Sequence, residues 1–221
     1  MIRYDLNFRL FFLIKVFFIY FIICLKSYAD TPKESNDLYT NNEDLGNLIV
    51  LRVVLGSDSA PVKIKVFSSL TCPHCADFHI KIVPKIKKNY VESGKVQLIF
   101  FDFPLDQASF NASKLLHCID QKKQIALLDT IYENQDEWIT GSDISEINNN
   151  LKKIVQILGI NSTQFDKCVN DEVIGDKILN GRIDGHQKYS INSTPTIIIN
   201  EKKLNDSASF KNIKKKIEKL I

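Results

Sequence analysis

The sequence predicts an α/β fold in which a long all-helical segment interrupts a set of strands. Residues 62–68 alternate apolar and lysine side chains, and residues 96–103 form a continuous apolar run; both patterns are typical of strands. From about Asp106 to Lys188, apolar residues recur with helical spacing instead. Strand patterns then return at 196–200 and 202–204, so the helical block is predicted to be an insertion.

The first 29 residues have the pattern of a secretory signal peptide. Arg3 and Arg9 precede an apolar stretch, Leu10–Leu25, which only Lys15 interrupts. Ser27-Tyr28-Ala29 then fits a cleavage site with small residues at its first and third positions. We therefore expect a mature chain that starts at residue 30.

Two other readings of this segment are weaker. An uncleaved anchor would need about 20 apolar residues to span a bilayer, and the run without a charge is only Val16–Leu25. A lipid anchor at Cys24 is disfavoured because bulky Ile23 precedes it.

The leader carries four basic residues and one acidic residue, so the remaining 192 residues have 25 of each kind. This balance argues against nucleic acid as a partner. Export would place the cysteines in an oxidising compartment. The C-terminal residues Glu218–Ile221 are not an endoplasmic-reticulum retention signal, which favours the bacterial periplasm.

The elements before the insertion follow from local patterns. Asp30 to Asn47 is polar and is expected to form a flexible arm. Strands are predicted at Leu48–Leu55, Val62–Ser68 and Val96–Phe103. An amphipathic helix is predicted from Pro73 to about Tyr90, with a kink at Pro84.

Five helices are predicted within the insertion, and one more closes the chain. Asn161 and Gln164 resemble a capping box that opens the fourth helix, and the fifth runs from about Val173 to Tyr189. The final helix shows apolar residues at helical spacing, and Lys214–Lys216 are expected to face solvent.

The motif Cys72-Pro73-His74-Cys75 stands between a predicted strand and a predicted helix. Pro73 suits the first helical position, which makes Cys72 the N-cap. Helix N–H groups and the helix dipole would then favour the Cys72 thiolate, and His74 would act in the same direction. Cysteines in such motifs have pKa values of roughly 3.5–7.5, against about 8.5 for an ordinary thiol. We expect Cys72 to exchange disulfides with a substrate, while Cys75 resolves the mixed disulfide.

Other readings of the motif remain open. The pair could be half of a zinc site, since Cys75 and His79 have i, i+4 spacing, but no second such pair is evident in the sequence. Haem attachment would require histidine at Ala76. A purely structural disulfide is the third alternative. His79 is expected to be a packed or capping residue, and neither a metal nor a cofactor is expected.

A second motif, Ser193-Thr194-Pro195-Thr196, directly precedes three isoleucines. Proline in a buried strand is confined to the first residue, and a cis bond is one way to make the bend. An ordinary trans turn is the alternative.

Together, these motifs resemble the DsbA group of thioredoxin-fold protein-disulfide oxidoreductases, and the similarity covers most of the mature chain. Gly56–Pro61, Phe78-His79 and Phe103-Pro104-Leu105 add to the resemblance. It implies a thioredoxin fold with an inserted all-helical domain between the third strand and the cis-proline strand. Pro195 would then be cis and lie beside the Cys72–Cys75 pair, and the Thr194 backbone would pair with substrate. The implied segments are a signal peptide at 1–29, an arm at 30–47, the thioredoxin fold at 48–105 and 188–221, and the insertion at 106–187.

Two positions depart from the family pattern. Where the family often has a buried acid before the motif, this chain has Val66, so water or another group must relay the proton of Cys75. Where the family often has Asn-Gly after the last buried strand, Asn200 is followed by Glu201, which tolerates the turn less well.

Cys118 and Cys168 are the two cysteines that remain after cleavage. In an exported chain we expect them to form a structural disulfide that closes a loop of roughly 50 residues. Two buried apolar thiols are the alternative. His117 is expected to be incidental, and Trp138 to belong to the core.

The leading functional hypothesis is an exported, monomeric oxidase that passes the Cys72–Cys75 disulfide to folding proteins and is reoxidised by a membrane partner. A reductase or isomerase is the alternative within the same chemistry. A non-enzymatic thiol or metal chaperone using Cys72, Cys75 and His79 is the alternative from another class.

Overall fold

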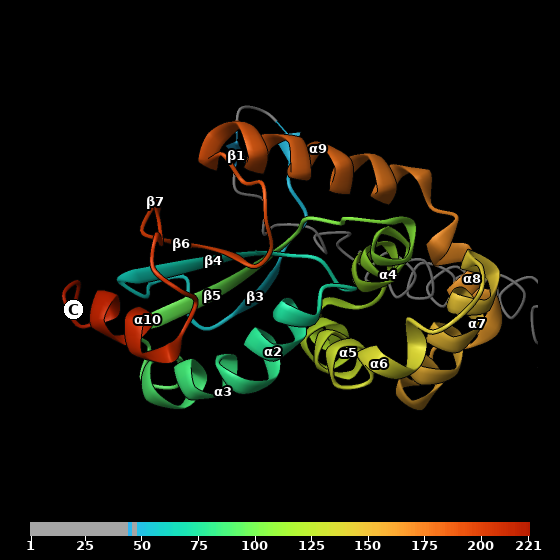
Figure 1. Ribbon diagram of the computed structural model, residues 1–221, viewed down its shortest axis with the longest axis horizontal. Helices are drawn as coiled ribbons and strands as arrows, with labels where there is room; N and C mark the ends of the chain where they lie inside the picture. Colours follow the sequence, from blue (N-terminus) through green and yellow to red (C-terminus); the bar gives the residue numbers. More distant parts are fainter. Residues whose placement is uncertain (1–43, 46–47) are drawn as a thin grey trace, which may run out of the picture. The chain divides into compact units, whose positions relative to one another are not determined.

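A computed structural model describes residues 44–45 and 48–221; the predicted signal peptide and most of the arm lie outside them. Its main sheet has the strand order β3-β5-β4-β6-β7, shown in Figure 1. The central strands β4 and β5 are parallel, and every other neighbour is antiparallel. The strands are β3 (Val53–Leu55), β4 (Val62–Ser68), β5 (Val96–Asp102), β6 (Thr196–Ile199) and β7 (Lys202–Lys203).

The first predicted strand, Leu48–Leu55, is wrong as a single element. The structure has β2 (Leu48–Ile49), which pairs with β1 (Asp44–Leu45), and a separate β3, which pairs with β5. Val50, which follows β2, packs into the buried cluster on one face of the main sheet, and Val53, the first residue of β3, packs into the cluster on the other face. Residues 50–52 have no regular secondary structure and separate two strands that belong to different sheets. The pairing of β1 also corrects the end of the predicted arm, because Asp44–Leu45 forms a strand.

Both faces of the main sheet are covered by helices (Figure 1). Side chains alternate along a strand, so Val62, Ile64 and Val66 of β4 enter the larger buried cluster, while Phe67 enters the smaller one. Helix α9 (Glu172–Tyr189) covers the second face. Consequently Lys65, which the alternation placed on a polar face, is only 4% exposed.

The helix after the motif is divided. α2 (Pro73–Lys81) has Ile82 as its C-cap, α3 (Val83–Ile86) follows, and Lys87–Val91 is a π-helical turn. Pro84 causes the division because it lacks an N–H and its ring clashes with the carbonyl one turn earlier. These helices and α10 (Phe210–Ile217) cover the face opposite α9 (Figure 1).

The insertion is helical throughout, as predicted, with one additional short helix. Asn161 caps α8 by accepting a hydrogen bond from the Gln164 N–H at 2.9 Å. Aspartates cap α4, α5, α7 and α9 in the same way. The helices are α4 (Gln107–Cys118), α5 (Gln121–Glu133), α6 (Gln135–Trp138), α7 (Ile144–Val155) with a 3-10 turn at Gln156–Leu158, α8 (Ser162–Val169) and α9.

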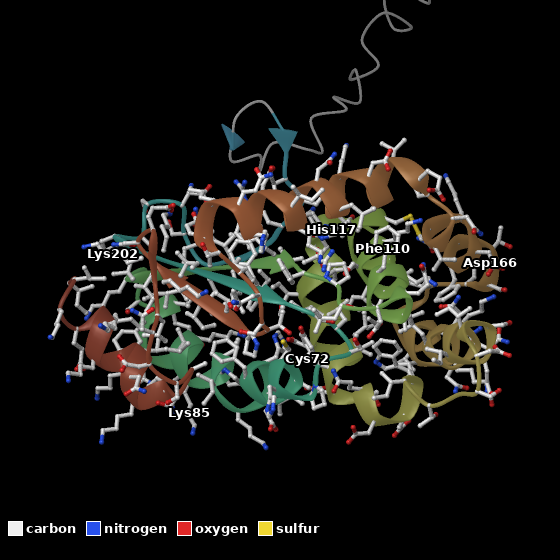
Figure 2. All side chains as sticks on the ribbon, turned by 45° about the horizontal axis from the view of Figure 1, so that its top comes forward. Cys72, Lys85, Phe110, His117, Asp166 and Lys202 are labelled. Carbon is white, nitrogen blue, oxygen red and sulfur yellow. A yellow bond between two sulfur atoms is a disulfide. The ribbon has the colours of Figure 1, made fainter. Side chains whose placement is uncertain are left out.

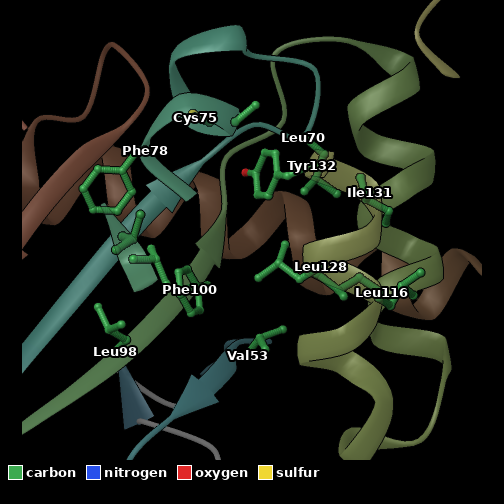
Figure 3. Close-up of a cluster of buried hydrophobic side chains, with 14 of the residues drawn as sticks. Val53, Leu70, Cys75, Phe78, Leu98, Phe100, Leu116, Leu128, Ile131 and Tyr132 are labelled. Carbon is green, nitrogen blue, oxygen red and sulfur yellow. The ribbon is translucent and has the colours of Figure 1, made fainter. Parts of the chain in front are cut away.

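The insertion and the sheet share one core. Figure 3 shows Val53, Leu98 and Phe100 from the sheet in the same cluster as Leu116 and Leu128 from the insertion. Trp138 is fully buried, as predicted. Among the residues that the structure describes, no helix is both long and apolar enough to cross a membrane.

The turn between β6 and β7 explains how Glu201 is tolerated. Asn200 and Glu201 both have positive φ, 41° and 65°, where glycine is usually preferred. The Glu201 carboxylate lies 2.7 Å from Lys65 Nζ and accepts a hydrogen bond from Tyr189 Oη at 2.5 Å. The side chain that strains the turn therefore also pairs with the buried lysine of β4.

Candidate active site

The motif begins helix α2, and Cys72 is its N-cap, as the sequence predicts. Cys72 has extended backbone geometry, φ −80° and ψ 120°, and Pro73 occupies the first helical turn. The Cys72 carbonyl accepts the N–H groups of Cys75 and Ala76 at 3.0 and 3.1 Å. The Cys72 sulfur therefore lies at the positive end of the helix, between the sheet and the insertion (Figure 2).

The two thiols, both reduced in this structure, have different surroundings. Cys72 is partly exposed, whereas Cys75 is 1% exposed and belongs to the core cluster in Figure 3. Burial raises the pKa of Cys75 from 9.0 to about 12, although the nearby Thr194 hydroxyl and Ser69 backbone lower it in part. A reagent in solvent therefore meets Cys72 first, and Cys75 can react with a disulfide already formed on Cys72.

Thr194-Pro195 lies directly beside the motif. The peptide bond between these residues is cis, as the resemblance implied, and β6 starts immediately after it. The Cys72 thiol donates to the Thr194 carbonyl at 3.5 Å. Thr194 Oγ1 is buried and has no partner at ordinary hydrogen-bond distance, but it lies close enough to Cys75 to lower the pKa of that thiol. Two segments 122 residues apart thus form one site.

Helix α4 holds the loop before the motif. Ser109 Oγ accepts the Leu70 N–H at 2.8 Å and a hydrogen bond from Ser69 Oγ at 2.9 Å. Asp106, the N-cap of α4, accepts the Thr71 hydroxyl at 2.6 Å and the Ser109 N–H at 2.8 Å. The start of the insertion thereby fixes the strand-to-helix connection that presents Cys72.

Gln135 of α6 and Tyr132 of α5 hold the same loop from the other side. Gln135 is 3% exposed, and its amide donates to the Leu70 carbonyl at 2.7 Å and to the Cys72 carbonyl at 3.2 Å. The Tyr132 hydroxyl donates to the Ser69 carbonyl at 3.5 Å. The sequence did not reveal the roles of four insertion residues that hold this loop: Asp106, Ser109, Tyr132 and Gln135. The aspartate before α4 was a visible helix-start signal, but nothing local connects Gln135 to the motif.

His79 is a packed residue, as expected, and it is also paired. It is 6% exposed, its Nε2 lies 2.6 Å from Asp129 Oδ1, and its ring centroid is 4.8 Å from that of Tyr132. Val66 is buried in the core at the position where the family often has an acid. The polar groups close to Cys75 are instead Thr194, the Ser69 backbone and Tyr132.

Cys118 and Cys168 form a disulfide that joins α4 to α8, with Cα atoms 5.5 Å apart. The expectation that neighbouring His117 is incidental is wrong. His117 is 3% exposed and its Nε2 lies 2.5 Å from the Asp102 carboxylate, whose other oxygen accepts the Ser113 hydroxyl at 2.6 Å. Asp102 ends β5, so this buried pair connects the sheet to α4.

Comparisons with known proteins agree with this geometry. The sequence profile of the family described as Thioredoxin matches residues 50–219. A probable disulfide bond formation protein D from Bacillus anthracis is 31% identical over 173 residues, covering 75% of this chain and 76% of that protein.

Solved structures give the same picture. The crystal structure of Wolbachia pipientis α-DsbA1 aligns with a TM-score of 0.70 and 30% identity, over 76% of this chain and 90% of that one. BdbD from Bacillus subtilis, in its oxidised form, aligns with a TM-score of 0.65 and 25% identity, over 76% and 91% of the two chains. The thioredoxin fold with a helical insertion is therefore confirmed. This chain belongs to the thioredoxin family as a DsbA-like protein-disulfide oxidoreductase, an enzyme of thiol-disulfide exchange.

Proposed function

We propose that the chain is an exported oxidase that donates a Cys72–Cys75 disulfide to folding proteins. The observation that carries this proposal is the unequal setting of the two sulfurs: Cys72 is partly exposed at the start of α2 beside Thr194, and Cys75 is buried one turn later. An accessible sulfur can be attacked from solvent, and a buried one is protected from substrates.

The exchange uses no reagent besides the two partners. A substrate thiolate attacks Cys72 Sγ of the oxidised pair, the Cys72–Cys75 bond breaks, and Cys75 leaves as a thiolate. Because the pKa of Cys75 is about 12, that thiolate takes up a proton at neutral pH. A second substrate thiolate then attacks the substrate sulfur of the mixed disulfide and expels Cys72. The substrate is oxidised by two electrons, and the Cys72–Cys75 pair is reduced by two.

The position of Cys72 supports the oxidising direction. The first turn of a helix has N–H groups without intrahelical partners, and together with the helix dipole these stabilise negative charge. Cys72 carries a free sulfur only in the reduced enzyme, so negative charge stabilised at this position would favour the reduced form and make the disulfide a stronger oxidant.

Two features support export. The sequence pattern of residues 1–29 is that of a cleavable leader. The Cys118–Cys168 disulfide suits an oxidising compartment, because structural disulfides are rare in the cytosol. In this scheme the mature protein is a periplasmic monomer, and a membrane redox partner restores the Cys72–Cys75 disulfide.

The redox potential of the Cys72–Cys75 couple tests the direction. The chain from Asp30 to Ile221 is equilibrated with glutathione buffers, and mass spectrometry follows alkylation of each cysteine. A potential near about −120 mV supports an oxidase, whereas one near about −270 mV would overturn the proposal in favour of a reductase. Export is tested separately: the full chain, expressed in a bacterium, should be recovered outside the cytoplasm with Asp30 as its first residue. Recovery in the cytoplasm at full length would contradict it.

A further inference from the structure

The balanced charge of the chain from Asp30 on is unevenly distributed. Residues 106–187, the insertion, contain 8 basic and 13 acidic residues. Residues 84–95 contain four lysines and one acid, Glu92, and residues 202–221 contain seven lysines and two acids, Asp206 and Glu218. These last two segments lie at the end of the sheet away from the insertion. Figure 2 shows Lys85 and Lys202 at that end and Asp166 at the other.

We call the eleven lysines of these two segments the basic end. All of them are exposed. The Tyr90 hydroxyl donates to Glu218 at 3.3 Å, so the π-helical turn after α3 is joined to the end of α10 and the two groups of lysines form one surface. Glu218 also lies 3.5 Å from Lys214. The lysines of the basic end are Lys85, Lys87, Lys88, Lys95, Lys202, Lys203, Lys211, Lys214, Lys215, Lys216 and Lys219.

A shallow groove with apolar residues in its lining opens on the basic end. It has a volume of about 290 Å³ and runs between β7 and the end of α10. Leu204 and Leu220 contribute apolar surface, and Lys202, Lys203, Lys216 and Lys219 stand around it. Leu220 is 46% exposed and the neighbouring Ile221 is 50% exposed.

We propose that the basic end docks the protein on an anionic phospholipid surface. Lysines attract anionic headgroups, and exposed Leu220 and Ile221 can enter the boundary between headgroups and acyl chains. The acidic insertion is repelled by the same surface, so the molecule is oriented with the insertion pointing away. Single-stranded nucleic acid fits less well, because binding of its bases uses exposed aromatic rings. The exposed large hydrophobic side chains of the described residues are all Ile, Leu or Val.

The docking surface is separate from the thiol chemistry. Cys72 lies between the sheet and the insertion, away from Lys202 and Lys85 (Figure 2). Docking would therefore leave Cys72 accessible while holding the enzyme close to a membrane. The inference does not depend on the direction in which electrons flow.

The test measures sedimentation of the chain from Asp30 to Ile221 with lipid vesicles. The described residues belong to one compact unit, and this chain contains all of them, so it keeps the whole described fold. Vesicles of phosphatidylcholine alone are compared with equal parts phosphatidylcholine and phosphatidylglycerol, at low salt and at about 0.5 M salt, where exposed charges are screened. We expect binding to the anionic vesicles at low salt and loss of that binding at high salt.

Matched variants decide whether the basic end is responsible. K202Q/K216Q/K219Q should lower the partition coefficient of the protein between water and anionic vesicles about a hundredfold, because each lysine contributes a factor of about five. K122Q/K123Q/K167Q changes the net charge equally on the insertion and should not weaken binding. L220S/I221S should weaken it several-fold. All variants should keep the wild-type rate of disulfide exchange with reduced insulin, which separates this test from that of the proposed function.

Three results would overturn the proposal. The first is an equal fall in binding for the two triple-lysine variants, which would mean that only net charge matters. The second is equal binding of the wild type to neutral and anionic vesicles. The third is binding to soluble polyglutamate that is as tight as binding to the anionic vesicles and depends equally on Lys202, Lys216 and Lys219. That result would make the basic end a surface for acidic proteins.

Discussion

Replacing Cys72 by serine leaves Cys75 as the only free thiol of the chain from Asp30 on, because Cys118 and Cys168 are bridged. Burial is the main cause of the raised pKa of Cys75, so the shift should persist in C72S. At pH 8 a thiol with pKa 9.0 is about 10% ionised, whereas one with pKa about 12 is about 0.01% ionised. Only the thiolate reacts with iodoacetamide, so ionisation alone predicts about a thousandfold slower alkylation of Cys75 than of an ordinary cysteine.

The assay follows mass gain over time in native buffer at pH 8 and again in concentrated urea. Urea removes the burial, so Cys75 should then react at the rate of an unstructured cysteine. C75S is the matched control, because it leaves the partly exposed Cys72, which should react readily in native buffer. Raising the pH of the native C72S sample should accelerate alkylation about tenfold per unit up to about pH 12, as long as the protein stays folded.

The reasoning would be refuted if native C72S reacted within about tenfold of its rate in urea. Such a result would mean that Cys75 is open to solvent or readily ionised. The assigned order of events, in which Cys72 exchanges with substrate and Cys75 resolves, would then lose its physical basis. Slow reaction in urea as well would point to an unexpected bond at Cys75.

Three further predictions concern stability. Q135L removes the hydrogen bonds that Gln135 donates to the Leu70 and Cys72 carbonyls, so it should lower the free energy of unfolding by about 1–3 kcal/mol and slow the oxidation of reduced insulin. Unchanged unfolding in urea together with an unchanged rate would show that Gln135 does not hold this loop. C118A/C168A removes a disulfide with a sequence separation of 50, for which the chain-entropy model predicts a loss of about 4 kcal/mol in the free energy of unfolding. A loss below about 1 kcal/mol, measured by unfolding in urea, would rule out that contribution. Partial burial raises the pKa of Glu201, but hydrogen bonds, chiefly from Lys65, lower it overall to about 2. This lowered pKa stabilises the fold at pH values above 4.5, the pKa of the unfolded state, and the stabilisation is lost as the pH falls towards 2. After allowance for the 54% exposure of Glu201, E201Q should lower the free energy of unfolding by about 1–2 kcal/mol at pH 7 and by much less near pH 2. An equal loss at both pH values would exclude the ion pair as the cause.

Features encoded by neighbouring residues could be read from the sequence. A proline directly after Cys72 predicted a helix start with that cysteine as N-cap, and the structure has it. Asn161 and Gln164 predicted a cap for the same local reason. Pro84 predicted a kink in the helix, and the structure divides the helix there, with α2 ending at Lys81 and α3 starting at Val83. Each of these depends on backbone geometry within one or two helical turns, where a short stretch of sequence contains all the interacting groups.

The roles of Lys65 and His117 could not be predicted in this way. Alternation in β4 indicates one polar face, but α9, more than a hundred residues later, covers that face and buries Lys65 beside Glu201. His117 pairs with Asp102 at the end of β5 only because α4 packs back against the sheet. Burial and partner depend on which surfaces meet, and a local pattern does not contain that information.

The sequence by itself determined the chemistry of this protein: two thiols one turn apart at a helix start, and Thr194-Pro195 before a buried strand. Tertiary structure decided how that chemistry is controlled. It buried Cys75 and left Cys72 accessible beside the Thr194 carbonyl, and it fixed their loop with Gln135 from the insertion. The physical reason is that reactivity follows from solvent access, local charge and hydrogen bonds, which exist only after distant segments have packed together.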